Sequence, residues 1–138
     1  MNVDLSGLPI DGPHTSDTVR DATYALGEIV RYLNYATNSA AVVSSGPVLF
    51  DAVSGIATAV QRLDQTVHQI STGALDLRVE PNLRDDRGDE VDPADTAEEV
   101  GDAVAQARRS LAIAARALQD AASAASHLGH SVDAEDAE

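Results

Sequence analysis

The strongest constraint on this chain is an apolar residue at every third or fourth position, sustained over three separate segments. Such spacing places an apolar stripe along one side of an α-helix. The stripes predict helices over about 16–43, 47–79 and 93–129. Their members are, in order, Val19, Ala22, Leu26, Ile29, Leu33, Ala36, Ala40 and Val43, then Leu49, Val53, Ile56, Val60, Leu63, Val67, Ile70, Ala74 and Leu77, then Ala97, Val100, Val104, Ala107, Leu111, Ala114, Leu118, Ala121, Ala125 and Leu128.

Helix-start and helix-stop residues flank these stripes. The run of Thr15, Ser16 and Asp17 offers N-caps for the first helix, and prolines stand at the first position of the second and third helices. Gly129 is a stop signal for the third helix. We expect the second helix to continue, weakened, past Gly73.

The connections between the predicted helices are short to moderate. They predict an all-α fold, an antiparallel three-helix bundle with heptad-like stripes and a long alanine-rich C-terminal helix. Residues 1–14 are expected to be an irregular lead-in, 15–130 the helical bundle with an acidic loop at 81–92, and 131–138 an acidic disordered tail.

The charge of the chain limits its direct partners. Over 138 residues the formal net charge is −14, and arginine supplies all nine basic side chains. Such a charge disfavours direct binding to nucleic acid or to an anionic membrane. No stretch has the pattern of a signal peptide or a membrane span, which favours a cytoplasmic location.

Sequence signals of catalysis are missing. The chain has no cysteine, no Gly-x-Ser-x-Gly elbow, no glycine-rich phosphate loop and no Glu-x-x-His motif. His127 and His130 are three apart with Gly129 between them, which favours helix capping over a metal site. The acidic run 84–92 does not follow the EF-hand ligand order and is interpreted as a solvated loop. We therefore expect a protein that is not an enzyme and holds no cofactor or metal.

Two sets of residues are candidates for protein interfaces. The third helix is also apolar outside its stripe, which predicts a self-association surface, although alanine also simply favours helices. The first helix places tyrosines and an arginine away from its stripe, either as a partner-binding patch or as a bundle edge with buried rings and wet hydroxyls. The residues are Ala103, Ile113, Ala115, Ala117, Ala122 and Ala124 on the third helix, and Tyr24, Arg31, Tyr32 and Tyr35 on the first.

The segment Ala25–Thr37, with the sequence ALGEIVRYLNYAT, precedes a proline-started second helix and an alanine-rich third one. In this order, and most specifically over Arg31 to Thr37, the chain resembles short uncharacterised all-helical proteins of Streptomyces and related actinobacteria, some of them on mobile elements. The resemblance implies the helical fold and brings no activity or site residue with it.

Three functions follow as hypotheses. The first is a non-enzymatic helical interaction module that self-associates and binds another protein. The second is an acidic accessory protein that occupies a nucleic-acid-binding protein by charge mimicry, in which carboxylates stand in for phosphates. The third is a bundle that binds a small molecule between its helices.

Overall fold

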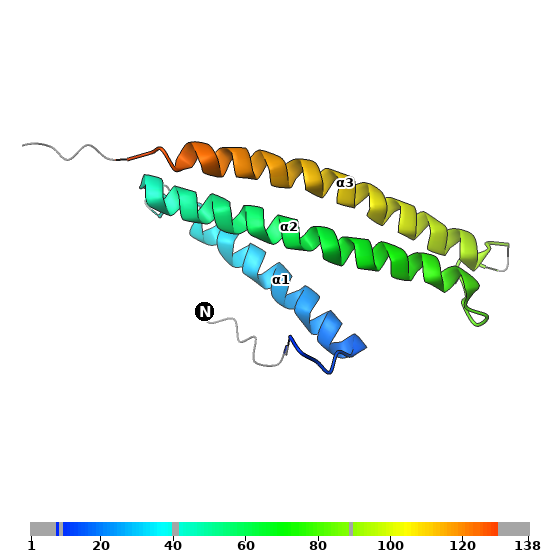
Figure 1. Cartoon of the computed structure of the whole chain (residues 1–138). Coiled ribbons are helices and arrows are strands. Elements are labelled where there is room, and N and C mark those ends of the chain that lie inside the picture. Colours follow the sequence, from blue (N-terminus) through cyan, green and yellow to red (C-terminus); the bar gives the residue numbers. More distant parts are fainter. Residues whose placement is uncertain (1–7, 9, 40–41, 89, 130–138) are drawn as a thin grey trace, which may run out of the picture. The chain divides into compact units, whose positions relative to one another are not determined.

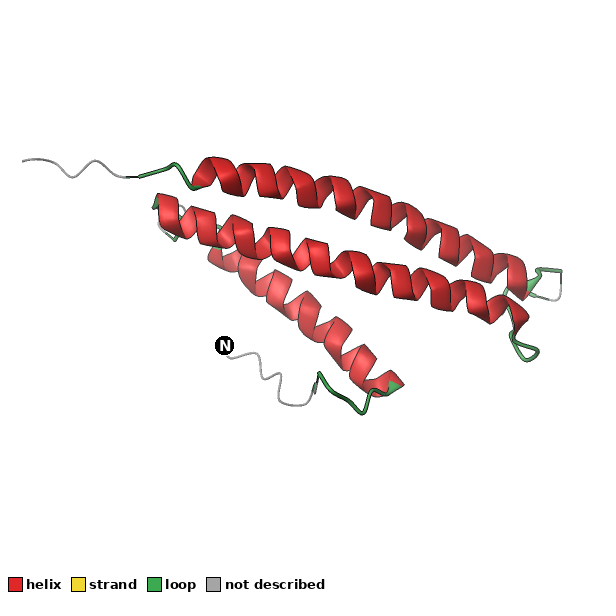
Figure 2. Ribbon diagram, in the orientation of Figure 1, coloured by secondary structure: helices red, strands yellow, loops and turns green. Residues whose placement is uncertain are grey.

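The computed structural model describes residues 8, 10–39, 42–88 and 90–129, and the regular structure in these ranges is helical throughout (Figures 1 and 2). The elements are α1 (Ser16–Ala36), α2 (Gly46–Asp76), a 3-10 helix η1 (Leu77–Val79) and α3 (Pro93–Ala125). The predicted all-α class is confirmed. The chain divides into two compact units, residues 1–44 with α1 and residues 45–138 with the other helices. The predicted acidic tail and His130 lie outside the described residues.

Helix α1 starts at a reciprocal cap. The backbone N–H of Thr18 donates to the Thr15 hydroxyl at 3.2 Å, and the backbone N–H of Thr15 donates to the Thr18 hydroxyl at 2.9 Å. The helix ends at Ala36, short of the expected limit near Val43. Thr37, whose hydroxyl donates to the carbonyl of Leu33 at 2.7 Å, begins a polar run whose side chains compete for backbone groups. Ala40, a member of the predicted stripe, lies outside the described residues.

Helix α2 starts and continues as its sequence signals indicate. Ser45 is the N-cap, and its hydroxyl accepts from the backbone N–H of Val48 at 3.4 Å. Pro47 occupies the first turn, where its missing N–H costs nothing. The helix runs through Gly73 to Asp76, and the tighter turn of η1 extends it to Val79.

Helix α3 begins at Asp92, whose carboxylate accepts from the backbone N–H of Ala94 at 2.9 Å. It spans 33 residues and ends at Ala125, earlier than the expected limit at Gly129. The Ser126 hydroxyl donates to the carbonyl of Ser123 at 2.7 Å, which offers the last turn an alternative to helical bonding.

Helices α2 and α3 run antiparallel along their whole length (Figure 1). Asp64 pairs with Arg108 and Ser71 with Gly101, so the residue number rises on one helix as it falls on the other. We call this pair of helices the hairpin. A three-helix bundle with α1 as the third member stays a prediction.

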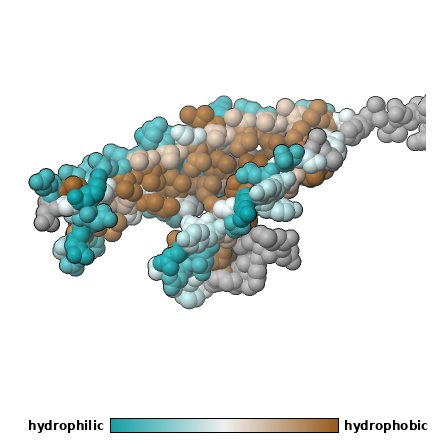
Figure 3. Space-filling view, turned by 180° about the vertical axis from the view of Figure 1, so that it is seen from behind, coloured by the Kyte–Doolittle hydropathy of each residue, from teal (hydrophilic) through white to brown (hydrophobic). Residues whose placement is uncertain are grey.

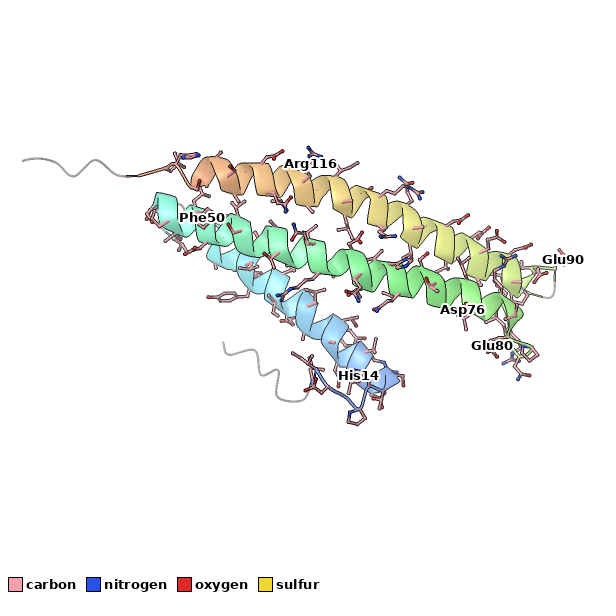
Figure 4. The ribbon with its side chains drawn as sticks, viewed as in Figure 1. His14, Phe50, Asp76, Glu80, Glu90 and Arg116 are labelled. Atoms are coloured by element: carbon pink, nitrogen blue, oxygen red, sulfur yellow. The ribbon has the colours of Figure 1, made fainter. Side chains whose placement is uncertain are left out.

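The connection from Glu80 to Asp92 is anchored by one carboxylate (Figure 4 labels Glu80 and Glu90 within it). The Asp85 side chain is only 5% exposed and accepts from Arg87 Nε at 2.9 Å and Nη2 at 2.8 Å. It also accepts from the backbone N–H of Arg87 at 2.9 Å and from the Thr96 hydroxyl of α3 at 2.6 Å. These donors, the Arg87 guanidinium first and Thr96 next, hold the pKa of Asp85 well below its ordinary value. The acidic loop is thus tied to the first turns of α3.

Replacing this carboxylate should loosen the connection. We expect Asp85→Asn to lower the melting temperature by several degrees at neutral pH, whereas Asp86→Asn, at an exposed neighbour, leaves it nearly unchanged. Because the pKa of Asp85 is depressed in the folded chain, its contribution is complete above the unfolded value of about 3.9 and is lost as the pH falls below it. Thermal melts followed by circular dichroism from pH 7 to pH 2 check this. A difference between wild type and Asp85→Asn that grows on acidification would contradict the assignment.

Candidate interaction surface

Small residues form the fully buried part of the contact between α2 and α3. Every buried residue in the described part of the hairpin is an alanine, a serine or a glycine. They are Ala57, Ser71 and Ala74 on α2, and Ala97, Gly101, Ala115, Ala122 and Ala125 on α3. Small contact residues let two helices approach closely, but they bury little apolar area. Each Å² of buried apolar area stabilises the fold by about 25 cal/mol, so such a contact contributes little.

The closest approaches lie near the two ends of the hairpin. The Ser71 hydroxyl donates to the carbonyl oxygen of Gly101 at 2.9 Å. A Cβ atom on Gly101 would stand 2.9 Å from Leu75 Cδ2, and one on Gly46 would overlap the backbone of Leu128. Glycine at these two positions therefore permits the observed spacing of the helices.

One ion pair lies in the middle of the contact. Arg108 donates to Asp64 through Nε at 2.9 Å and Nη2 at 3.2 Å. The Asp64 carboxylate raises the pKa of the Arg108 guanidinium through these hydrogen bonds. Both side chains are partly exposed, so the pair contributes modestly to stability, but its two-bond geometry fits a single register of the helices.

The contact line on α3 differs from the predicted stripe. It passes through Ala97, Gly101, Val104, Arg108, Leu111, Ala115, Leu118, Ala122 and Ala125, which are buried or half-buried. Val100, Ala107, Ala114 and Ala121 were expected to face inward and are exposed. The prediction was wrong here because a glycine and an arginine do not look like core residues, although Gly101 allows close approach and Arg108 is neutralised.

On α2 the prediction was right in part, because Val53, Val60 and Val67 of the stripe are half-buried and Ala74 is buried. Ala57, Asp64 and Ser71 lie in the contact, whereas Ile56, Ile70 and Leu77 are 40%, 51% and 46% exposed. These large residues belong to a row with one member at every seventh position, Leu49, Ile56, Leu63, Ile70 and Leu77. We call this the large row. The seven-residue spacing of this row is visible in the sequence, but we expected the row to lie in the core.

A row of small residues runs along α3 beside its contact line. We call it the small row. It begins beside Val100 and consists of Ala103, Ala107, Ser110, Ala114, Ala117, Ala121 and Ala124, all exposed.

Both rows lie on the same side of the hairpin. Leu77 and Val100 line one groove together with Ala74 and Ala97, and the rows depart from the contact line in the same sense on the two antiparallel helices. Figure 3 shows apolar surface extending along the hairpin. The two rows together are called the apolar flank.

The opposite side of the hairpin is polar. His68 of α2 and Arg109 of α3 line a groove of about 290 Å³ with Asp64, Arg108 and Ala112. Gln61, Gln65 and Thr72 continue this side along α2 at helical spacing and are exposed. On α3, Arg116 projects away from α2 (Figure 4). The hairpin therefore has two flanks of opposite character.

The predicted residues of α3 divide between these surfaces. Ala103, Ala117 and Ala124 are exposed in the small row. Ile113 is 74% exposed and lies further round the helix, away from α2. Ala115 and Ala122, expected on an outer face, are buried in the contact with α2, because the contact line is rotated relative to the predicted stripe.

The predicted residues of α1 share one face of that helix. Tyr24, Tyr32 and Tyr35 are 70%, 55% and 73% exposed. Arg31 forms an ion pair with Glu28 at 3.5 Å, and the two line a groove of about 270 Å³ with Tyr32 and Tyr35. The face lies opposite the stripe of α1. We call it the tyrosine face.

No known protein family, curated protein or solved structure matches the chain. The resemblance to actinobacterial proteins therefore stays a prediction. Within the described ranges, the His, Asp and Glu side chains form no group of three or more that could hold a metal ion. None of the helices described combines the length and apolar composition needed to cross a membrane.

The ion pair in the contact can be tested by a double-mutant cycle. Asp64→Leu alone leaves a half-buried arginine unpaired and should lower the free energy of unfolding by about 1 kcal/mol, as should Arg108→Leu. Asp64→Leu with Arg108→Leu should recover that loss or exceed it, because two apolar side chains replace two charges. Urea unfolding at one fixed protein concentration measures all four proteins. Additive losses in the double variant would contradict this account.

Proposed function

We propose that the chain is a non-enzymatic interaction module whose hairpin self-associates through the apolar flank. One observation carries the proposal: among the described residues, the hairpin fully buries only small side chains and leaves Ile56, Ile70 and Leu77 of its large row exposed. A contact made of alanines contributes little by area, and covering a half-exposed Leu or Ile contributes about 1 kcal/mol. A second apolar surface on this flank therefore supplies what the contact of α2 with α3 lacks.

The tyrosine face of α1 is the second part of the proposal, as a surface for another protein. Tyrosine and arginine are enriched among residues that dominate binding energy. Here three exposed tyrosine rings share a face with the Glu28–Arg31 pair and a groove between them. The rings can be covered by a partner without first breaking buried contacts of their own.

A three-helix bundle within one chain is the competing way to cover the apolar flank. Helix α1 has a stripe of its own, with Val19, Leu26 and Leu33, and none of its residues is buried. That arrangement needs no second copy, so the mass in solution separates it from self-association.

Light scattering after size exclusion measures that mass. We expect the wild type to run at twice its 14.4 kDa chain mass and Ile70→Glu to run as a monomer with unchanged helicity. A glutamate on the flank enters a two-fold interface twice and would be desolvated without a partner. Gln69→Glu, the matched control, adds the same charge at the neighbouring exposed position and should remain a dimer.

The small row offers an independent test with its own control. Ala117→Glu should dissociate the dimer, whereas Ala112→Glu, on the polar flank of the same helix, should not. A wild-type monomer at every concentration would contradict the proposal, and so would equal effects of the two alanine variants.

A further inference from the structure

We propose that the occupant of the apolar flank is the same flank of a second copy, related by a two-fold axis parallel to the helices. The large row of one protomer then packs into the small row of its partner, and the two hairpins form a four-helix bundle. This inference rests on the proposed function and adds to it the partner, the pairing of the rows and the register.

The flank is complementary to itself. It presents large side chains on α2, such as Ile56, Leu63 and Ile70, and small ones on α3, such as Ala107 and Ala114. A two-fold axis parallel to the helices exchanges α2 and α3 across the interface. Each protrusion then faces a depression, twice over, which is the property that a symmetric interface requires.

The register of the hairpin determines which residues would meet across this interface. Asp64 lies opposite Arg108 and Ser71 lies opposite Gly101, so Leu63 is level with residue 109. Rotation about an axis parallel to the helices keeps each residue at its level. The partner's Leu63 therefore meets α3 between Ala107 and Ala114, over Ser110.

The neighbouring members of the large row meet similar depressions. By the same register, Ile56 is level with residue 116, between Ala114 and Ala121. Ile70 is level with residue 102, between Val100 and Ala107. Because both rows repeat every seven residues, one placement satisfies Leu49, Ile56, Leu63 and Ile70 together, whereas Leu77 is level with residue 95, outside the small row.

The area of the flank is sufficient for a stable interface. From Leu49 to Leu77 the flank is about 42 Å long at 1.5 Å per residue, and two helices are about 20 Å wide. The product, about 800 Å² on each partner, is what a stable protein interface needs.

The charge on and around the flank also favours a second copy as its occupant. The flank consists of Leu, Ile, Val, Ala and one Ser, so it offers no group that would select a charged partner. The proposed axis brings the two acidic connections to the same end of the bundle, where Glu80, Asp86 and Glu90 are exposed. Their repulsion is screened beyond about 8 Å at physiological ionic strength, so packing decides the arrangement and low salt weakens it.

Disulfide trapping tests the arrangement, since the chain has no cysteine of its own. Leu63→Cys protein is mixed with Ser110→Cys protein, oxidised and run on a non-reducing gel. We expect the mixture to give about tenfold more linked dimer than either protein alone, because apposed thiols react at millimolar effective concentration. Ile56→Cys mixed with Ala117→Cys is a second pair with the same expectation. Gln65→Cys mixed with Ala112→Cys, on the polar flank, is the control.

The outcomes separate this inference from the proposed function. Linking of Leu63→Cys with itself, in a protein of dimer mass, would place α2 against α2 and overturn the row pairing while self-association stands. A dimer mass with no linking in either pair would overturn the flank as the interface. A monomer would overturn both proposals and point to cover from within the same chain. A dimer that tightens when salt is removed would contradict the placement of the acidic ends.

Discussion

The close approach of α2 and α3 is the constraint on which the rest of the hairpin depends. Gly101 has no room for a side chain beside Leu75, and the buried positions along both helices hold only small residues. The larger side chains along the contact line, such as Leu111 and Leu118, are only half-buried. Ile56, Ile70 and Leu77 of α2 lie exposed beside the contact, so the packing that forms the hairpin also creates its apolar flank.

Polar groups give this contact its register. A line of alanines presents nearly the same surface after one helix is shifted by seven residues along the other. Alanines alone therefore define the alignment of α2 with α3 only weakly. Asp64 with Arg108 and Ser71 with Gly101 are each satisfied at one alignment only. Partly exposed ion pairs add little stability, but a single polar pair can select one arrangement among several of similar packing. The levels of the large row and the small row follow from that selection.

The sequence predicted the three helices, because apolar spacing and caps such as Asp92 are local properties of the chain. It did not predict which neighbouring row of an alanine-rich helix faces its partner. Hydrophobicity favours rows that contain Val100 or Ile70, whereas the observed contact needs the small volume at Gly101 and the charge balance at Arg108. Both requirements, the small volume at Gly101 and the charge balance at Arg108, depend on the residues of α2 that face these positions. The exposure of the tyrosine face was not predicted, since the sequence left open both a partner-binding patch and a bundle edge with buried rings.

The arrangement of the two flanks also bears on how far association proceeds. An apolar surface on both sides of a hairpin would let copies stack without end, as non-closing interfaces do. Here one side is apolar, and the other carries Gln61, His68, Arg109 and Arg116. A two-fold contact between apolar flanks leaves only these polar sides outward, on a chain whose net charge is −14. In the proposed dimer, like charges then oppose further stacking of hairpins.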